Sequence, residues 1–573
     1  MARASNLSVL TCSAAVLLAG LLYLNTLNNP FVYDDARSIL NNRSLTTRAS
    51  VTAVVRENVS RPLVSLSYFI DHAIWGPAPF GYHVTSVLLH MLNVALLFLF
   101  TRGVVIDRLR DEGTARERRA VLAAGVAATL FAVHPMMTEA VGYISGRSDL
   151  LSGTFMLLSF VTVRQWLNTD RSLWLMAALA AFFLALSAKE TAFVLPVLFL
   201  YYILLVRNDP PAARRRHLIM LCVPLLAIAI VGASARLGLF VFVEHGGAVG
   251  WQWRFALSEL DVFTRYLALI IAPVGQTIFH GVPATTSFFE PRAIVALTTA
   301  AIYLGLILLA AKRRSLGGFG LAWFVLMLLP SAILVLMNRA EPMAERRVYF
   351  ASAGLFLAAG HGAAAIALML ESARRFTRTL AAAAAIVLLA ALAGRTILRN
   401  LVWSSPILLW TEAVERTPDH WLPLLVLGES FHEAGRHADA IAAYRRALGY
   451  GAHVAAVYEH LGLCQLELKE LDDAVVTFTA LATIYPNSAS ATNGLAMVDL
   501  LRGNLDAARR GFLASLDLEP RSIEARHGLV LVEERAGGRS EEALRRCEEI
   551  ALIAPGTPGT AECIERHRPL PSP

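Results

Sequence analysis

The strongest constraint on the fold is a series of long apolar runs in the first 400 residues of this 573-residue chain. A helix of about 20 apolar residues spans the hydrocarbon core of a bilayer. The first run is longer than the apolar core of a signal peptide, about 7–15 residues, which favours an uncleaved helix over a cleaved leader. We predict an all-α, polytopic membrane bundle of about eleven spans over residues 1–400, with runs near 7–27, 84–105, 120–134, 149–168, 173–187, 191–206, 218–240, 293–311, 319–337, 351–370 and 380–397.

Charged residues are unevenly distributed along the chain. Only 17% of the residues are charged and 56% are hydrophobic, whereas a soluble domain has about 25% and about 45–50%. The charges are dense after residue 400, so the remainder is predicted to form a second, soluble body. The formal net charge is +7, but the basic residues form short clusters and no basic stripe carries interleaved aromatic residues. This pattern argues against a nucleic-acid-binding protein.

Four clusters of Lys and Arg in the short loops predict the orientation of the bundle, because these residues favour the cytoplasmic side. All four lie on that side if the amino terminus is cytoplasmic and the short run 262–275, which contains Pro273, is re-entrant. The loop 28–83 and everything after the last span are then outside. The clusters are Arg108, Arg110, Arg116, Arg118 and Arg119; Arg214 to Arg216; Lys312 to Arg314; and Arg374, Arg375 and Arg378.

The soluble part has a period of about 34 residues, and this pattern resembles the tetratricopeptide repeat. Such helix pairs stack into a solenoid with a concave binding surface. We predict about four repeats over 421–567, after a linker at 401–420 and before a tail at 568–573. The recurring features are prolines (Pro418, Pro486, Pro520, Pro555), turns (434–440, 468–474, 502–508, 536–543), Leu-Gly pairs (427–428, 461–462) and aromatic residues (Tyr444, Phe478, Phe512).

The five cysteines form no recognisable pattern. Cys12 and Cys222 lie in apolar runs, and Cys464, Cys547 and Cys563 are scattered in the repeat region, with no CxxC pair. The favoured interpretation is that they are small, buried apolar residues. A metal or redox site is therefore not predicted.

Two adjacent carboxylates, Asp34 and Asp35, follow the first apolar run. Adjacent side chains of an extended segment point in opposite directions. One can therefore face a cavity while the other caps the helix that begins near Ala36. A simple helix cap at a hydrated loop is the alternative interpretation.

Polar residues of several further loops are predicted to lie on the same side of the membrane as this pair. Each has a simpler interpretation as a snorkelling anchor, part of an aromatic belt or a helix cap. Their location on one side favours a functional site. These residues are Arg61, His83, His134, Glu139, Arg147, Asp149, Lys189, Glu190, Arg346, Arg347 and Tyr349.

An ordered series of motifs precedes the repeats: FVYDDARSIL (31–40), RPLVSLSYFID (61–71), PFGYHVTSVLLHMLN (79–93), HPMMTEAVGYISGRSDLL (134–151), SAKETAFVLP (187–196) and ERRVYF (345–350). Together with the repeats, this series resembles the transmembrane and tetratricopeptide-repeat O-mannosyltransferases, membrane glycosyltransferases of the GT-C superfamily. The resemblance covers nearly the whole chain. One departure is Ser-Ala-Lys-Glu at 187–190, where Ser-Lys-Glu is expected.

The resemblance implies a polyprenyl- or dolichyl-phosphate sugar donor, commonly mannose, and an active site outside the cytoplasm, with Asp34 and Asp35 as the catalytic pair. A carboxylate within hydrogen-bond reach can take the proton of the acceptor hydroxyl. Cationic side chains can stabilise the leaving phosphate, and the candidates are Arg147, Lys189, Arg346 and Arg347. The acceptor-binding or supporting candidates are Arg61, His83, His134, Glu139, Asp149, Glu190 and Tyr349.

We therefore expect an inverting single displacement without a metal or another cofactor. The Ala- and Arg-rich composition predicts a bacterial chain of the inner membrane, whose periplasmic repeats hold a polypeptide or glycan acceptor. One alternative is an O-antigen ligase or polymerase, although the large late external loop expected of such an enzyme is missing between 351 and 397. The other alternative is a non-catalytic membrane scaffold whose repeats recruit partners.

Overall fold

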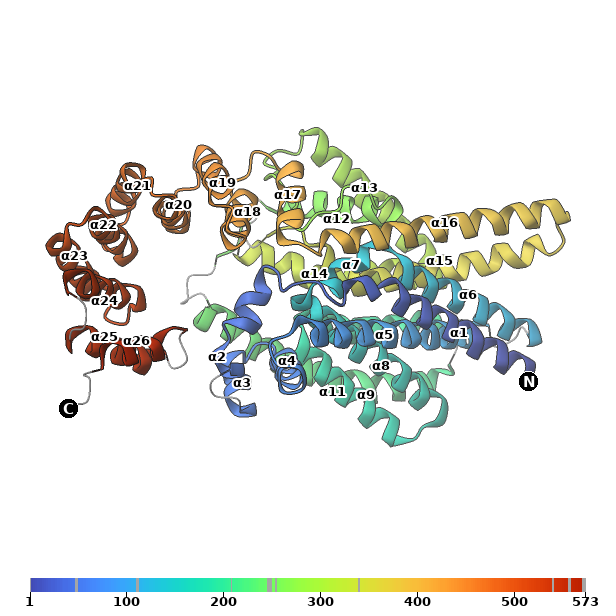
Figure 1. The fold of residues 1–573 in the computed structure, drawn as a ribbon. Helices are drawn as coiled ribbons and strands as arrows, with labels where there is room; N and C mark the ends of the chain where they lie inside the picture. The colour runs from blue at the N-terminus through green and yellow to red at the C-terminus, as the bar shows by residue number, and fades with distance from the viewer. Residues whose placement is uncertain are drawn as a thin grey trace. The chain divides into compact units, whose positions relative to one another are not determined.

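The computed structural model divides into two compact units, residues 1–409 and 410–573. It contains helices and no strand among the residues that it describes, as Figure 1 shows. This confirms the predicted all-α fold class. The described residues are 2–46, 50–109, 113–207, 209–244, 250–252, 255–338, 341–537, 541–554 and 558–568. Arg110, Pro555, part of the predicted turn 536–543 and residues 569–573 of the predicted tail lie outside these ranges.

The first unit is a bundle in which long helices lie side by side (Figure 1). Its helices are α1 (Ala2–Leu22), α2 (Arg43–Thr46), α3 (Val51–Glu57), α4 (Pro62–Trp75), α5 (Pro79–Arg108), α6 (Gly113–Val133), α7 (Thr138–Gly142), α8 (Arg147–Thr169), α9 (Ser172–Ala188), α10 (Leu195–Tyr201), α11 (Pro211–Gly238), α12 (Ala256–Ile271), α13 (Pro291–Lys312), α14 (Leu316–Asn338), α15 (Val348–Leu370) and α16 (Arg375–Val402). Short π-helical turns cover Ala36–Leu40, Tyr202–Val206 and Leu239–Glu244.

Eight helical segments of the described chain are long and apolar enough to cross a membrane. A ninth candidate is a pair, Arg116–Val133 and Pro135–Gly142, bent by 61°. The bend follows from Pro135, which lacks a backbone N–H. Two shorter apolar helices, Ser172–Ala188 and Glu190–Val206, complete the set. Each of the eleven predicted runs coincides with one of these segments, whereas α12, over the run predicted to be re-entrant, is not among them.

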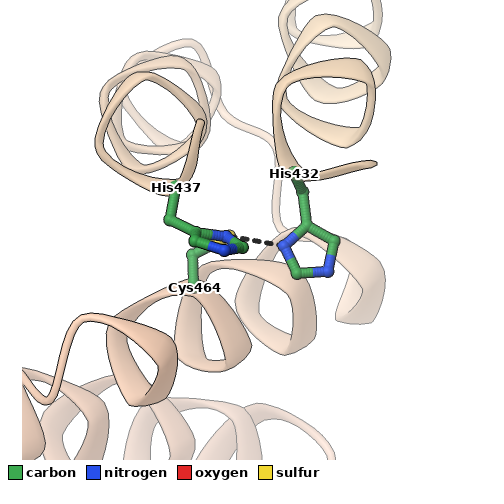
Figure 2. A group of neighbouring side chains, drawn as sticks. All are labelled: His432, His437 and Cys464. Atoms are coloured by element: carbon green, nitrogen blue, oxygen red, sulfur yellow. Dashed lines mark hydrogen bonds between the residues drawn. The ribbon is translucent and has the colours of Figure 1, made fainter. Parts of the chain in front are cut away.

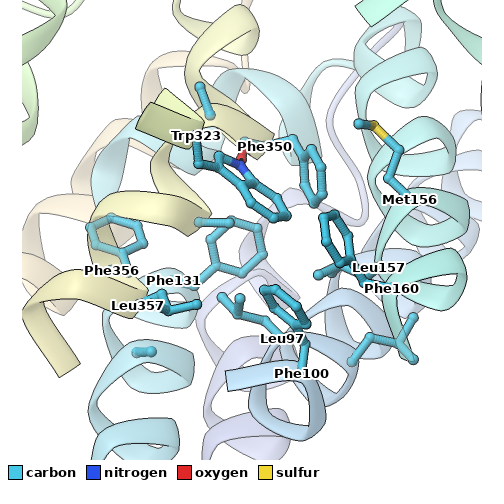
Figure 3. Close-up of a cluster of buried hydrophobic side chains, with 14 of the residues drawn as sticks. Leu97, Phe100, Phe131, Met156, Leu157, Phe160, Trp323, Phe350, Phe356 and Leu357 are labelled. Atoms are coloured by element: carbon cyan, nitrogen blue, oxygen red, sulfur yellow. The ribbon is translucent and has the colours of Figure 1, made fainter. Parts of the chain in front are cut away.

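Aromatic side chains fill the centre of the bundle (Figure 3). Phe160 of α8 has its ring centroid 4.8 Å from that of Phe100 on α5 and 5.0 Å from that of Trp323 on α14. The indole N–H of Trp323 donates to the carbonyl of Phe350 on α15 at 3.0 Å. Glycine allows this close approach, because a Cβ on Gly354 would clash with the backbone of α14. Small residues commonly permit such contacts between membrane helices.

The basic clusters gather at one end of the bundle. Arg108, at the end of the 30-residue helix α5, donates to the carbonyl of Arg314 at 3.0 Å. Arg118 pairs with Glu371 at 2.7 Å, next to the fourth cluster. Since α5 is about 45 Å long, its first residue, Pro79, lies at the far end from these clusters.

The chain leaves the bundle at that far end. The side-chain amide of Asn400, near the end of α16, donates to the carbonyl of Leu22 at 3.0 Å, and Asn25 donates to the carbonyl of Ile397 at 3.1 Å. The last apolar helix therefore ends beside the residues that lead into the loop 28–83.

The second unit consists of stacked helix pairs. Its helices are α18 (Trp421–Glu433), α19 (His437–Gly449), α20 (Ala455–Glu467), α21 (Leu471–Ile484), α22 (Ala489–Arg502), α23 (Leu505–Leu518), α24 (Ile523–Gly537), α25 (Glu541–Ile553) and α26 (Thr560–His567). Helix α17 (Pro406–Arg416) contains the boundary between the units and lies in the segment predicted as a linker. A Cβ on Gly428 or Gly462 would overlap the ring of Tyr444 or Phe478, which explains why the Leu-Gly pairs recur in register with the aromatic residues.

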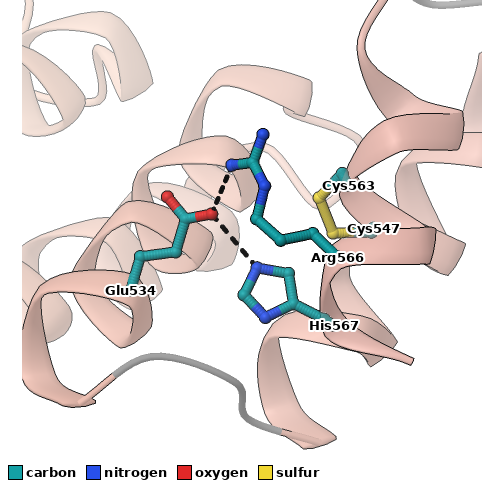
Figure 4. The surroundings of a disulfide bond; sticks show 5 residues. All are labelled: Glu534, Cys547, Cys563, Arg566 and His567. Atoms are coloured by element: carbon teal, nitrogen blue, oxygen red, sulfur yellow. Dashed lines mark hydrogen bonds and ion pairs between the residues drawn. A yellow bond between two sulfur atoms is a disulfide. The ribbon is translucent and has the colours of Figure 1, made fainter. Parts of the chain in front are cut away.

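A disulfide joins Cys547 of α25 to Cys563 of α26 (Figure 4), with Cα atoms 5.9 Å apart. Beside it, Glu534 of α24 accepts hydrogen bonds from Arg566 at 2.8 Å and from His567 at 3.1 Å. These two cysteines are buried as predicted, but their interpretation as plain apolar side chains is wrong, because they form a disulfide. Closing a loop of about 15 residues stabilises a fold by about 3 kcal/mol in the chain-entropy description.

Candidate active site

A polar cavity of about 880 Å³ lies at the end of the bundle that carries the loop 28–83. Helices α3 and α4 and the π-helical turn Ala36–Leu40 supply part of its wall, and later loops supply the rest. Of the residues predicted from sequence, those that line it are Asp34, Arg61, Lys189, Glu190, Arg346 and Arg347. The structure thus brings together six of the thirteen predicted residues at one cavity.

The two aspartates point in different directions. Asp34 is exposed and lines the cavity, and its backbone N–H donates to the Tyr143 hydroxyl at 3.1 Å. Asp35 is fully buried. Its carboxylate accepts hydrogen bonds from the Ser145 N–H at 2.8 Å, the Ser145 hydroxyl at 2.5 Å and the Val32 N–H at 3.1 Å. Asp34 therefore faces the cavity beside the Tyr143 hydroxyl, while Asp35 anchors the loop to the segment that precedes α8.

The backbone around Asp34 has an uncommon conformation. Tyr33 has φ 51°, in the left-handed region, which costs a residue other than glycine about 1–3 kcal/mol. A π-helical turn, Ala36–Leu40, begins two residues after Asp34, and π-helical turns occur frequently at functional sites. Tyr143, whose hydroxyl accepts the Asp34 N–H, stacks on Trp403 with ring centroids 5.5 Å apart. This stacking fixes the position of the hydroxyl that Asp34 contacts. These features hold Asp34 at the cavity surface.

Three cations at the cavity are each held by a carboxylate. Lys189 Nζ contacts both oxygens of Asp149 at 2.6 and 2.7 Å. The guanidinium of Arg61 donates to both oxygens of Glu190 at 3.1 and 3.2 Å. Cations paired with a carboxylate in this way have fixed positions, which suits recognition of a phosphate.

Arg346 is the third of these cations. It donates to the carboxylate of Glu139 from its guanidinium at 2.5 Å and from its backbone N–H at 3.1 Å. Glu139 and Asp149 do not line the cavity themselves. Their carboxylates pair with Arg346 and Lys189 and fix the positions of these two cations.

Arg347 connects the polar cavity with a second, apolar one. This apolar cavity has a volume of about 360 Å³ and is lined mainly by α12, α13 and α14. Arg347 and Ser331 line both cavities. The guanidinium of Arg347 donates to the carbonyls of Pro342 at 2.7 Å and Glu341 at 2.8 Å, which fixes it at the junction.

The predicted phosphate-binding role of Arg147 does not agree with its position. Arg147 is fully buried, does not line the cavity, and forms an ion pair with buried Asp71. It also donates to the carbonyl of Tyr82 at 2.7 Å and lies over the ring of Tyr68 at 4.9 Å. Arg147 therefore joins α8 to α4 and α5 instead of facing a ligand.

Replacing Arg147 with methionine should destabilise the protein by about 3–5 kcal/mol, because Asp71 is then a buried charge without its partner. The double variant with Asp71→Leu should recover most of this loss. The measurement is the unfolding temperature of the purified protein in detergent. A control is Arg102→Met, which removes the partner of Glu117 from a partly exposed pair and should cost less than about 1 kcal/mol. Normal stability of Arg147→Met would contradict a structural role.

The remaining predicted residues lie away from the cavity. His83 is buried with its Nε2 at 3.1 Å from the carbonyl of Asn29. His134 Nδ1 accepts from the Met136 N–H at 3.2 Å, and its Nε2 lies 2.9 Å from the carbonyl of Ile270. The hydroxyl of Tyr349 lies 2.9 Å from His90 Nδ1 inside the bundle. These three side chains support the structure around the site and are not placed to contact an acceptor.

Comparison with known proteins gives matches for both parts of the chain. The tetratricopeptide-repeat family model matches residues 408–452 and 425–489. The protein O-mannosyl-transferase Tmtc1 of Drosophila melanogaster is 39% identical over 198 residues, 32% of this chain and 21% of that protein. The human protein O-mannosyl-transferase TMTC1 is 24% identical over 517 residues, 78% of this chain and 56% of that protein. The chain resembles the transmembrane and tetratricopeptide-repeat O-mannosyltransferases. The comparison confirms the resemblance predicted from the motifs.

The match to these O-mannosyltransferases is partial in length. The chain spans about a fifth of the Drosophila relatives that it matches, with 21% of Tmtc1 and 20% of Tmtc2 covered. Tmtc2 of the same organism is 35% identical over 208 residues, 32% of this chain.

Three further arginines line the cavity and were missed from the sequence: Arg37, Arg56 and Arg236. Arg37 and Arg56 belong to the loop 28–83, where no local pattern distinguishes an arginine that faces the cavity from one that faces water. Arg236 lies in α11, inside an apolar run, where an ionisable residue signals function. That signal was available in the sequence. Arg56 and Arg236 lie outside the O-mannosyltransferase motifs, whereas Arg37 lies inside the motif 31–40.

Proposed function

We propose that this chain is a membrane glycosyltransferase that transfers a hexose, mannose or a related sugar, from a polyprenyl-phosphate donor to an acceptor hydroxyl on the extracytoplasmic side. The observation that carries the proposal is the junction at Arg347. There a polar cavity, lined by an exposed carboxylate and several cations, adjoins an apolar cavity between membrane helices. A lipid-linked sugar phosphate has the same three parts in the same order: a sugar, a phosphate and a hydrocarbon chain.

The apolar cavity suits the lipid of the donor. It is lined by residues such as Leu260, Phe263, Ile307 and Leu328 from α12, α13 and α14. Burial of apolar surface there would contribute about 25 cal/mol per Å². With the isoprenoid chain in this cavity, the phosphate lies beside Arg347 and the sugar enters the polar cavity.

Asp34 supplies the general base in this proposal. The oxygen of the acceptor hydroxyl forms a bond to the anomeric carbon, and its proton passes to the Asp34 carboxylate. The bond between the anomeric carbon and the phosphate oxygen breaks, and the electron pair leaves with polyprenyl phosphate. One displacement of this kind inverts the configuration at the anomeric carbon. Lys189, Arg346 and Arg347 stabilise the charge that develops on the phosphate.

The cations of the cavity support a transfer without a metal ion. Seven Lys and Arg side chains line it: Arg37, Arg56, Arg61, Lys189, Arg236, Arg346 and Arg347. Guanidinium and ammonium groups bind phosphate directly. We therefore expect the transfer step at this cavity to require no metal ion.

Two observations support the proposed extracytoplasmic location of the site and of the repeats. The basic clusters, which favour the cytoplasm, lie at the opposite end of α5 from the cavity. The repeats contain a disulfide, and disulfides form and persist in oxidising compartments such as the periplasm. The bacterial inner membrane, with the repeats in the periplasm, is consistent with both.

The repeats are proposed to bind a polypeptide or glycan acceptor, since a solenoid offers an extended concave surface. Deleting residues 421–573 should then weaken the use of acceptor more than the binding of donor. Equal loss of both, in a correctly inserted bundle, would contradict this role.

The proposal is tested in membrane vesicles that contain the chain and a radiolabelled polyprenyl-phosphate mannose. Label should pass to polypeptide or glycan, and the new linkage should have the anomeric configuration opposite to that of the donor. Vesicles without the chain are the control. An inserted protein that transfers no sugar from any polyprenyl-phosphate hexose would instead favour the non-catalytic scaffold.

The rate of transfer should rise with pH through about 7. Burial raises the pKa of the Asp35 carboxyl to about 7, an effect partly offset by the hydrogen bonds from Ser145 and Val32 and reinforced by Asp34. Only the ionised carboxyl can accept all of its hydrogen bonds, so below about pH 7 the loop that carries Asp34 loses an anchor. The measurement is kcat/KM against pH, in which Asp35→Asn should lack this inflection. An unchanged inflection in Asp35→Asn would assign it to another group.

A further inference from the structure

Three side chains that the proposed transfer does not use meet in the first two repeats (Figure 2). His432 lies in the last turn of α18, His437 is the first residue of α19, and Cys464 lies in α20. One nitrogen of each histidine and the sulfur of Cys464 all lie within 4.8 Å of one another. The cluster therefore connects three consecutive helices through groups that are metal ligands.

The hydrogen bonding of this cluster is incomplete. Cys464 Sγ lies 3.2 Å from His432 Nδ1. The Nδ1 atom of His437 is buried and has no hydrogen-bond partner among the described residues. A buried imidazole nitrogen without a partner is unfavourable, and coordination of a cation would satisfy it. This second observation points to a ligand at the same place.

We propose that His432, His437 and Cys464 form a zinc site that joins the first repeat to the second. Two imidazole nitrogens and one thiolate are ligands that Zn²⁺ prefers, whereas Ca²⁺ and Mg²⁺ require oxygen ligands. Tetrahedral Zn²⁺ with Zn–N about 2.0–2.1 Å and Zn–S about 2.3 Å places its ligand atoms about 3.4 Å apart. A small contraction of the cluster reaches that geometry. The fourth position is taken by water or by a group of the bound acceptor.

Zinc at this position has a structural consequence. Helices α18 and α19 belong to one repeat and α20 begins the next, so the ion bridges a repeat interface. Neighbour interfaces carry much of the stability of repeat arrays. The ion would hold the first two repeats in one orientation, as the disulfide holds α25 to α26.

The test uses the full-length protein purified in detergent, stripped with a chelator and then titrated with Zn²⁺ against a competing chromophoric chelator. We expect about one tightly bound zinc per chain. Replacement by Co²⁺ should give a thiolate-to-cobalt charge-transfer band in the near ultraviolet. Cys464→Ser should abolish this band, and His437→Asn should weaken zinc binding by more than the about 10–100-fold that loss of an outer-shell partner causes.

Matched controls are Cys222→Ser, in α11, and His527→Asn, in α24, which lie outside the cluster and should bind zinc like the natural protein. Size-exclusion elution and circular dichroism establish that each variant is folded. The cobalt band of the natural protein is a direct readout that no misfolded variant can imitate. Absence of that band, or zinc binding that Cys464→Ser leaves unchanged, would overturn the proposal.

Discussion

Asp34→Asn should abolish sugar transfer while the protein remains folded and inserted. Asp34 is the predicted carboxylate that is exposed on the cavity surface, and an amide of the same size cannot accept the proton of the acceptor hydroxyl. Loss of a general base typically costs about 10²–10⁴-fold in rate. Asp34→Asn keeps the backbone contact, because the N–H that donates to Tyr143 is unchanged. The measurement is the initial rate of label transfer from the polyprenyl-phosphate donor at saturating donor and acceptor.

Asp35→Asn is the matched control for Asp34. It removes the same charge one residue later, but from a side chain that accepts hydrogen bonds from Ser145 and Val32. The asparagine oxygen can still accept from Ser145, so transfer should fall less than in Asp34→Asn and the loop should exchange its amide hydrogens faster. If Asp35→Asn abolishes transfer and Asp34→Asn retains most of it, the assignment of the base is reversed.

The fold could be predicted from the sequence because its signals are local. Each apolar run is long enough to be recognised alone, and the repeat period is visible in the spacing of Pro486 and Pro520. Both features are confirmed. The pair of aspartates could also be found, together with the expectation that one faces a cavity. Which of the two does so depends on Ser145, 110 residues away from Asp35, and no local pattern contains that information.

The partners of the charged residues could not be predicted for the same reason. Arg147 and Lys189 look alike in sequence, because each lies at one end of an apolar helix. Arg147 is the first residue of α8, and Lys189 directly follows α9. Arg147 pairs with Asp71 in the interior, whereas Lys189 pairs with Asp149 at the edge of the cavity. Only the packing of α4 against α8 distinguishes the two.

The same limit applies to the cysteines. Cys547 and Cys563 are 16 residues apart, and they pair because α26 folds back on α25. That arrangement is not visible in the spacing of the cysteines. Tertiary packing, and not local composition, decides which cysteines of the repeats meet a partner.

Arg347→Gln should lower transfer by about 10²–10³-fold, the loss typical when one group that stabilises an oxyanion is removed. Arg347 is the charged side chain shared by the apolar and polar cavities, so a phosphate between a lipid and a sugar must pass next to it. Glutamine retains hydrogen-bond donors but removes the charge. The affinity for a non-transferable polyprenyl-phosphate analogue should therefore fall as well, measured by competition with labelled donor.

Arg265→Gln is the matched control for Arg347. Arg265 lies on α12, pairs with Asp261 at 2.9 Å and lines neither cavity, so its loss should leave donor binding and transfer nearly unchanged. If Arg347→Gln binds the donor analogue normally but transfers sugar slowly, the phosphate lies elsewhere, beside Lys189 or Arg346. If both variants behave like the natural protein, the phosphate does not lie at the junction, and the route of the lipid between α12, α13 and α14 is wrong.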